Sequence, residues 1–198
     1  MAIASSPTEI YTAEEYLALE VESDLRSEYR NGAIVPMTGG TPEHNRITSA
    51  LNALLWFGLR GKPYSIFITD QRLWIPAVDR YTYPDVMAIA NPVELKPGRK
   101  DTVTNPVLIA EVLSDSTRAY DRGDKFEAYR TIPTFQEYLL IDPYRLHIEQ
   151  FVKQSNNQWL FTEYSGLDDR ISLSSLPAEI SLRDLYEGVL EADGELEQ

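Results

Sequence analysis

The clearest pattern along the chain lies in residues 41–61, where apolar side chains recur at helical spacing. They follow the i, i+3, i+4, i+7 rule for one buried helix face, and they are Ile47, Ala50, Leu51, Leu54, Leu55 and Leu59. Thr41 can cap this helix, Pro42 suits its first turn, and Gly61 lies just past its end. We therefore predict an amphipathic helix that packs one face against a core.

Other segments show helical or extended patterns. Residues 12–20 predict a short helix capped by Thr12, and Asn31-Gly32 lies between two short extended runs, as in a type I′ hairpin turn. Residues 121–132 predict a helix that ends before Pro133, and residues 180–188 predict a short one. The remaining patterned runs predict strands, and they are 64–70, 71–76, 84–90, 105–113, 137–143, 145–153 and 158–164.

This order of elements predicts the fold class. Helices and strands alternate irregularly, which favours an α/β (α+β) fold with a central mixed β-sheet flanked by helices. No repeat, low-complexity tract or linker divides the chain, so we expect one domain over residues 1–198. The acidic ends, residues 1–10 and 187–198, are expected to be flexible extensions of that domain.

Composition narrows the choice of compartment and chemistry. The chain has no cysteine, which excludes disulfides, thiolate metal sites and cysteine nucleophiles. No run approaches the roughly 20 apolar residues of a membrane helix, and the N-terminus lacks the basic and apolar regions of a signal peptide. We therefore expect a cytoplasmic protein without a membrane partner.

The net charge of -13 argues against tight, non-specific binding of nucleic acid. The charge is concentrated at the ends, however, because residues 1–24 and 187–198 carry 11 acidic and no basic side chains. Residues 25–186 carry 20 acids against 18 bases. A local basic patch on this nearly neutral body remains compatible with the sequence.

Two carboxylates stand in runs where apolar residues are expected. Asp85 lies in "YPDVMAIA" and Glu111 in "LIAEVLSDST", 26 residues apart. Two neighbouring strands could place them side by side, where they would repel each other unless a proton or cation lay between them. Carboxylate oxygens suit Mg²⁺ or Mn²⁺. For Asp85 alone, a turn residue after Pro84 is the simpler interpretation, whereas Glu111 is harder to explain without a partner.

The ordered motifs "YPDV", "LIAEVLSDST", "DRGDKFEAY" and "EYLLIDP" resemble the restriction-endonuclease-like family within the PD-(D/E)xK nuclease superfamily. The segment "SEYRNGAIVPMTGGTPEHNRITSALNALL" resembles its N-terminal half, so the resemblance covers roughly residues 11–153. It implies a mixed-sheet nuclease core, one site for a divalent metal such as Mg²⁺ or Mn²⁺, a nucleic-acid substrate and a homodimer.

The resemblance also implies roles for particular residues. Asp85 and Glu111 match the two metal-binding carboxylates of the superfamily. The superfamily pattern has a lysine two residues after the glutamate, where this chain has Leu113. Lys125, in the following predicted helix, is the matching candidate for that function. Its simpler interpretation is a solvated ion pair with Asp121, four residues earlier.

Two further residues match the family at its N-terminal half. Glu28 corresponds to the hairpin glutamate, a further candidate ligand for metal or water, although it could simply pair with Arg30. His44 corresponds to the histidine at the opening of the long helix, where it could bind phosphate or assist proton transfer. Alone, it would be interpreted as a surface or capping residue. The other histidine, His147, is interpreted as an ordinary strand residue.

The predicted function is divalent-metal-dependent endonuclease activity on DNA phosphodiester bonds, with Asp85, Glu111, Lys125, Glu28 and His44 as candidate catalytic residues. Two alternatives stay open. One is a nuclease-fold protein that binds a partner or nucleic acid without cutting it. The other is a phosphodiesterase that acts on small nucleotides, which would tolerate a negative surface better. Recognition sequence and the choice between DNA and RNA are not encoded in any motif.

Overall fold

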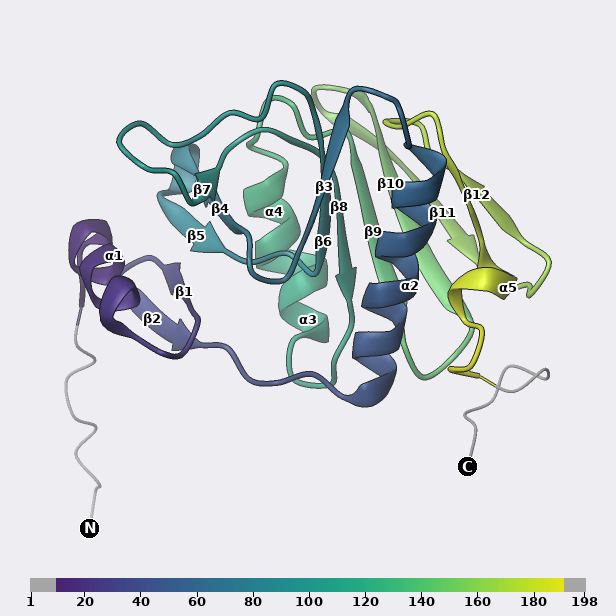
Figure 1. The fold of residues 1–198 in the computed structure, drawn as a ribbon, viewed down its shortest axis with the longest axis horizontal. Coiled ribbons are helices and arrows are strands. Elements are labelled where there is room, and N and C mark those ends of the chain that lie inside the picture. The colour runs from purple at the N-terminus through teal and green to yellow at the C-terminus, as the bar shows by residue number, and fades with distance from the viewer. Residues whose placement is uncertain (1–9, 191–198) are drawn as a thin grey trace, which may run out of the picture.

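The computed structural model describes residues 10–190, which form two main β-sheets with helices packed around them (Figure 1). The larger sheet has the strand order β11-β10-β9-β8-β6-β3. Its strands are β3 (Tyr64–Ile68), β6 (Val86–Ala90), β8 (Pro106–Val112), β9 (Glu137–Asp142), β10 (His147–Ser155) and β11 (Gln158–Tyr164). β8 and β9 run parallel and the other neighbours antiparallel, so the predicted mixed sheet is confirmed.

A second sheet, with the order β2-β1-β5-β4-β7, was not predicted. It consists of β1 (Ser27–Arg30), β2 (Ala33–Pro36), β4 (Arg72–Ile75), β5 (Arg80–Thr82) and β7 (Thr102–Val103). β5 and β7 are too short to show an alternating pattern in the sequence. The predicted hairpin is present in this sheet, because β1 and β2 pair antiparallel around Asn31 and Gly32, which both have positive φ.

The helices begin where their caps predict. Thr12 forms a capping box with Glu15, and the Thr41 side chain accepts a hydrogen bond from the backbone N–H of His44. The helical segments are α1 (Ala13–Glu22), α2 (Pro42–Gly58), α3 (Arg118–Tyr120), the π-helical turn η2 (Asp121–Lys125), α4 (Phe126–Tyr129) and α5 (Leu182–Leu185), with a 3₁₀ turn η1 (Pro76–Val78).

Two predicted helices differ from those observed. The segment predicted over 121–132 begins at Arg118 and passes through a π-helical turn before α4. The helix predicted over 180–188 shrinks to four residues, because Ile180 belongs to β13 (Glu179–Ser181), which pairs with β12 (Arg170–Ser172). Burial of Ile180 in the core outweighs its helical spacing.

The larger sheet is covered on both faces (Figure 1). Alternate residues of β8 point to opposite sides, so Leu108 and Ala110 pack with α2, whereas Ile109 packs in the cluster that includes α4. Glu111 shares the parity of Ile109. The strand therefore directs this carboxylate into the layer between the sheet and α4.

The ends of the chain bear on two predictions. The flexibility expected for residues 1–10 and 187–198 falls mostly on residues 1–9 and 191–198, which lie outside the described residues. Within 187–190, the side chains of Val189 and Leu190 are buried in the core. No helix in the described part of the chain combines the length and apolar character that crossing a membrane requires.

Candidate active site

Asp85 and Glu111 lie next to each other at one end of the β6–β8 ladder. Asp85 is one residue before β6 rather than inside it, and the register that pairs Val86 with Ala110 brings it opposite Glu111. The backbone N–H of Asp85 lies 3.4 Å from Glu111 Oε2, and Asp85 Oδ2 accepts a hydrogen bond of 2.8 Å from the N–H of Val112. The two strands thus bring together the carboxylates that the sequence singled out.

The π-helical turn η2 places the Lys125 ammonium beside the Glu111 carboxylate. Its Nζ lies 2.9 Å from Glu111 Oε1, 3.4 Å from Asp121 Oδ1 and 3.8 Å from Glu28 Oε1. Only 8% of the lysine side chain is exposed. The ion pair with Asp121 exists, but it is buried rather than solvated. Lys125 therefore lies inside a carboxylate cluster, and its simpler interpretation as a surface helix residue does not hold.

Leu113 fills the position where the superfamily pattern has a lysine. Its side chain is buried in the cluster formed by α4 and the larger sheet, together with Ala128 and Tyr129. An ammonium group there would displace apolar packing. The cation beside Glu111 comes instead from η2, 14 residues further along the chain.

Glu28 and His44 also reach the site. Glu28 accepts hydrogen bonds from Thr82 and from Arg30, whose Nη2 lies 2.5 Å from Glu28 Oε2. The pairing with Arg30 and the approach to Lys125 therefore coexist. His44, in the first turn of α2, places Nε2 3.2 Å from Asp85 Oδ2. All five residues predicted from the sequence thus converge, whereas His147 lies in β10 as an ordinary strand residue.

Burial is the largest single influence on the pKa values of Glu111 and Lys125. It raises the pKa of the Glu111 carboxyl to about 8, even though the Lys125 ammonium lowers it. Burial opposes the charge of Lys125, but Glu111, Glu28 and Asp121 together raise its pKa well above 10.5. A proton on Glu111 would remove one of these counter-charges. Glu28 and Asp121 would still lie beside the Lys125 ammonium.

The two flanking residues shift in opposite directions. Burial would raise the pKa of Glu28, but Lys125, Arg30 and the hydrogen bond from Thr82 hold it below 4.5. Burial would lower the pKa of His44, yet the hydrogen bond and charge of Asp85 raise it above 6.5. The site therefore combines an ionised glutamate with an imidazole that is held next to a carboxylate.

Tyr129 is a site residue that the sequence analysis missed. Its buried hydroxyl donates a hydrogen bond of 2.6 Å to Glu111 Oε1, the same oxygen that Lys125 contacts. The spacing held a signal, because Tyr129 follows Lys125 by four residues and thus lies on the same helical face. Together the two side chains fix the orientation of the glutamate.

The remaining carboxylate oxygens fit a hard cation. Lys125 and Tyr129 occupy Glu111 Oε1, and Val112 and His44 occupy Asp85 Oδ2. Glu111 Oε2 has only the long contact to the Asp85 N–H, and Asp85 Oδ1 accepts no hydrogen bond from the described residues. No cluster of three or more metal-ligating side chains occurs within residues 10–190. This donor set suits Mg²⁺, which commonly takes one or two carboxylates and completes its shell with water and phosphate.

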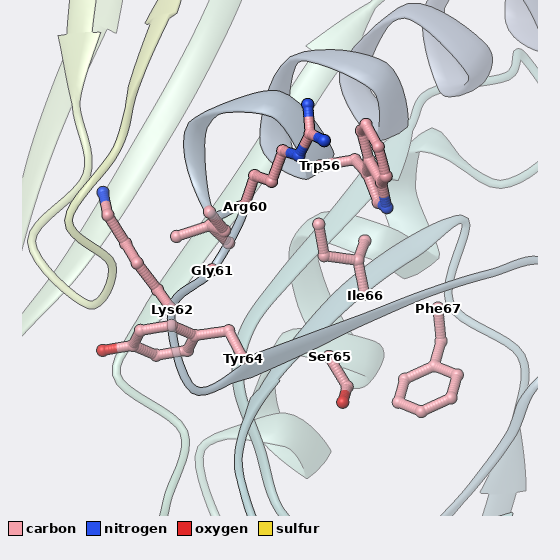
Figure 2. A pocket seen from close by; sticks show the side chains of 9 residues that line it. Trp56, Arg60, Gly61, Lys62, Tyr64, Ser65, Ile66 and Phe67 are labelled. Carbon is pink, nitrogen blue, oxygen red and sulfur yellow. The ribbon is translucent and has the colours of Figure 1, made fainter.

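A separate hollow of about 470 Å³ lies at the C-terminal end of α2 and beside β3 (Figure 2). Trp56, Arg60, Lys62, Tyr64 and Phe67 contribute to its wall. Its lining residues, all within the described chain, include no carboxylate or histidine. This hollow is therefore distinct from the carboxylate site at the opposite end of α2.

Known proteins resemble this chain both in sequence and in fold. The sequence model of the Uma2 family, described as "Putative restriction endonuclease", matches residues 13–185. The uncharacterized protein sll1609 of Synechocystis is 44% identical over 167 residues, which cover 84% of this chain and 94% of that protein. The uncharacterized protein slr1290 of the same organism is 35% identical over 187 residues, which cover 93% and 96%.

A crystal structure from Anabaena variabilis, of a "putative nuclease belonging to DUF820", superposes with a TM-score of 0.72. The match covers 90% of this chain and 99% of that one, at 19% sequence identity. At this identity the likeness concerns the fold. It agrees with the predicted architecture of a mixed sheet with flanking helices.

Proposed function

This chain belongs to the Uma2 family of restriction-endonuclease-like proteins, and on that premise we propose that it is a divalent-metal-dependent endonuclease that hydrolyses DNA phosphodiester bonds. The observation that carries the proposal is the cluster of buried Glu111 and Lys125 with partly buried Asp85. Burying an acid and an amine is costly unless their charges serve a purpose or are fully paired. Here each acid keeps one oxygen that the described side chains leave available.

Asp85 and Glu111 would hold the metal, for which Mg²⁺ and Mn²⁺ are the candidates. When bound, such an ion lowers the pKa of a water molecule and polarises the phosphate. Its positive charge would also favour the ionised form of Glu111, whose pKa burial raises. The raised pKa of Glu111 and its available Oε2 atom therefore both support a metal-binding role for this residue.

The surrounding side chains would orient these ligands and the attacking water. Lys125 can donate to a water beside Glu111 and offset negative charge that develops on the phosphate. Tyr129 holds Glu111 through Oε1, and His44 holds Asp85 through Oδ2. Glu28, which stays ionised beside Lys125, keeps that amine charged.

Cleavage of supercoiled plasmid with Mg²⁺ or Mn²⁺ tests the proposal. We expect Asp85→Asn, Glu111→Gln and Lys125→Met each to lower the rate on the order of 100-fold or more, as loss of a group that stabilises the transition state does. Glu127→Gln is the matched control, because Glu127 lies on α4 with 73% of its side chain exposed. Cleavage that survives unchanged in the three site variants would overturn the assignment.

Two outcomes would identify the alternatives. Hydrolysis of bis(p-nitrophenyl) phosphate without any cleavage of DNA or RNA would indicate a phosphodiesterase for small nucleotides. Absence of hydrolysis, together with no Mn²⁺ binding in calorimetry, would indicate a nuclease-fold protein that binds without cutting.

The homodimer and the cytoplasmic location remain predictions, from the resemblance and the composition respectively. Light scattering after size-exclusion chromatography measures the first directly. A homodimer would give twice the chain mass of 22.5 kDa. A mass equal to one chain across the micromolar range would contradict it.

A further inference from the structure

The β1–β5 ladder separates its side chains into an aromatic face and a charged face. Tyr29 pairs with Tyr81, and both pack in the cluster beneath α1. In an antiparallel ladder this register aligns Arg30 with Arg80 one step away, on the opposite face. That second face is turned toward Tyr120 and the carboxylate cluster, because both guanidinium groups lie over the Tyr120 ring.

Like charges directly opposite each other on neighbouring strands are unfavourable. Here the Arg30 and Arg80 guanidinium carbons lie 3.6 and 5.9 Å from the Tyr120 ring centroid. The Lys125 ammonium lies 5.9 Å from the same centroid. Three cations therefore surround one aromatic ring, next to the proposed active site.

The neighbouring carboxylates pair with two of these three cations, because Lys125 also contacts Glu111 and Asp121. Glu28 pairs with both Arg30 and Lys125. Its Oε2 lies 2.5 Å from Arg30 Nη2, and its Oε1 lies 3.8 Å from Lys125 Nζ. Arg80 forms no ion pair with any described carboxylate. Its Nη1 donates 3.0 Å to the backbone oxygen of Asp124, whereas its buried Nε has no partner. The buried Tyr120 hydroxyl also lacks a partner.

Arg80 is the residue that this arrangement leaves unexplained. It is only 8% exposed, and a buried charged donor without a partner is costly. The unused Nε donor of Arg80 and the unpaired hydroxyl of Tyr120 both indicate that a ligand with acceptor oxygens, such as an anion, fits this place.

We propose that Arg30, Arg80 and Tyr120 bind a second phosphate of a polynucleotide strand, adjacent to the phosphate that is cleaved. Guanidinium groups suit phosphate because their planar N–H forks match its oxygens. A phosphate can approach this subsite from solvent at Arg30, because 26% of the Arg30 side chain is exposed. Glu28 links this subsite to Lys125, so the two phosphates would lie on either side of one carboxylate.

This inference rests on the proposed nuclease activity and specifies its substrate class. A substrate with a single phosphodiester group cannot occupy both places. The chain should therefore prefer oligonucleotides over bis(p-nitrophenyl) phosphate, and the preference should depend on the two arginines.

The test compares Arg30→Gln and Arg80→Gln with the wild type on both substrates in Mn²⁺. We expect the KM for a single-stranded oligonucleotide to rise about 10-fold or more in both variants. In Arg80→Gln, kcat/KM for bis(p-nitrophenyl) phosphate should stay within about twofold of wild type, whereas Arg30→Gln also loses the contact to Glu28. The log–log salt slope of oligonucleotide binding should become shallower by about 0.7 for each phosphate that a variant no longer neutralises. Arg170→Gln is the control, because Arg170 is 64% exposed and pairs with Glu179 on the β12–β13 ribbon.

Equal losses on both substrates in Arg80→Gln, or no loss on the oligonucleotide, would overturn the subsite. Should Arg80→Gln fail to fold, Arg30→Gln carries the test through the salt slope of oligonucleotide binding, and an unchanged slope would then overturn the subsite. If the wild type cleaves neither substrate, the proposed activity fails, and the subsite is then judged by oligonucleotide binding alone. Wild-type binding that the two arginine variants leave unweakened, or no binding at all, would overturn it in that case.

Discussion

Tyr129 determines which oxygen of Glu111 is available to a ligand. Its hydroxyl and Lys125 both engage Oε1, which leaves Oε2 facing Asp85. We expect Tyr129→Phe to lower kcat about 10-fold with little change in KM, because the glutamate loses an orienting bond. Loss of this buried hydrogen bond should also lower the free energy of unfolding by about 1–3 kcal/mol.

Steady-state kinetics and urea unfolding measure these two effects. Tyr144→Phe is a suitable control, because its hydroxyl donates a hydrogen bond to Thr41 at an exposed site. A Tyr129→Phe variant with wild-type kcat would exclude an orienting role for this hydroxyl.

The residues of the site could be predicted to different extents. A carboxylate in an apolar strand is visible in the sequence, as Glu111 was. Arg80 and Tyr120 carry no such signal in the sequence, because the surroundings of Arg80 depend on which strand pairs with β5. This pairing joins residues that are far apart in the chain, and the two strands are too short to be recognised from their own sequence patterns.

At the scale of elements, the β1–β2 hairpin carries Glu28 and Arg30 and depends on Gly32. This glycine has φ of +88°, and a Cβ added there would lie 2.7 Å from Ile10 Cγ2. We expect Gly32→Ala to lower the free energy of unfolding by about 1–3 kcal/mol, because strained left-handed backbone and the close contact add.

Thermal unfolding of Gly32→Ala and of a control, Gly39→Ala, measures this effect. No atom lies within 4 Å of a Cβ added at Gly39, so that variant should stay close to wild type. Equal stability of the two variants would contradict the role given to the hairpin turn.

Asp142, at the end of β9, ties this strand to α3 and to the turn before β10. Arg118 Nη1 and Arg145 Nε donate to its Oδ2 at 2.8 and 2.9 Å, and the Tyr144 N–H donates to Oδ1 at 3.1 Å. Burial raises its pKa, but these donors, led by Arg118, outweigh that effect and hold the pKa below 3.8. Its contribution to stability is therefore present above about pH 4 and is lost as the pH falls through the folded-state pKa.

We accordingly expect Asp142→Asn to be less stable than wild type by about 1–3 kcal/mol at pH 7. The difference should shrink as the pH falls below 4, where wild-type Asp142 takes up its proton. Urea unfolding at pH 7 and at a series of lower pH values measures it. A difference that does not shrink on acidification would contradict the pKa direction.

The elements themselves were largely predictable where local chemistry decides. Thr12 and Thr41 mark helix starts through their capping hydrogen bonds, and Asn31-Gly32 marks a turn through positive φ. The π-helical turn at Asp121–Lys125 could not be predicted, because no residue type encodes it. Its last residue, Lys125, contacts Glu111 of the larger sheet, which is a long-range feature of the fold.

At the scale of the whole molecule, both sheets contribute to one site. The smaller sheet brings Glu28, the larger sheet brings Asp85 and Glu111, and η2 brings Lys125 between them. A chain with a net charge of -13 thus places Arg30 and Arg80 beside these carboxylates. The sequence predicted the larger sheet, but the smaller one depends on pairings between short strands far apart in the chain.

Because the site joins both sheets, metal binding should stabilise the entire fold. Metal at 100 times its Kd contributes about 2.7 kcal/mol, which corresponds to roughly 5–10 °C in Tm for a chain of this size. Calorimetry with and without Mn²⁺ measures the shift for wild type and Glu111→Gln. A shift of equal size in the variant would show that the ion binds elsewhere.

The central claim is that Asp85 and Glu111 together bind a divalent metal next to Lys125. Anomalous diffraction from a crystal soaked in Mn²⁺ tests it most directly. We predict a peak within bonding distance of both carboxylates, with the Lys125 ammonium still beside Glu111. A peak only at other positions, or a Lys125 side chain turned away to solvent, would contradict it.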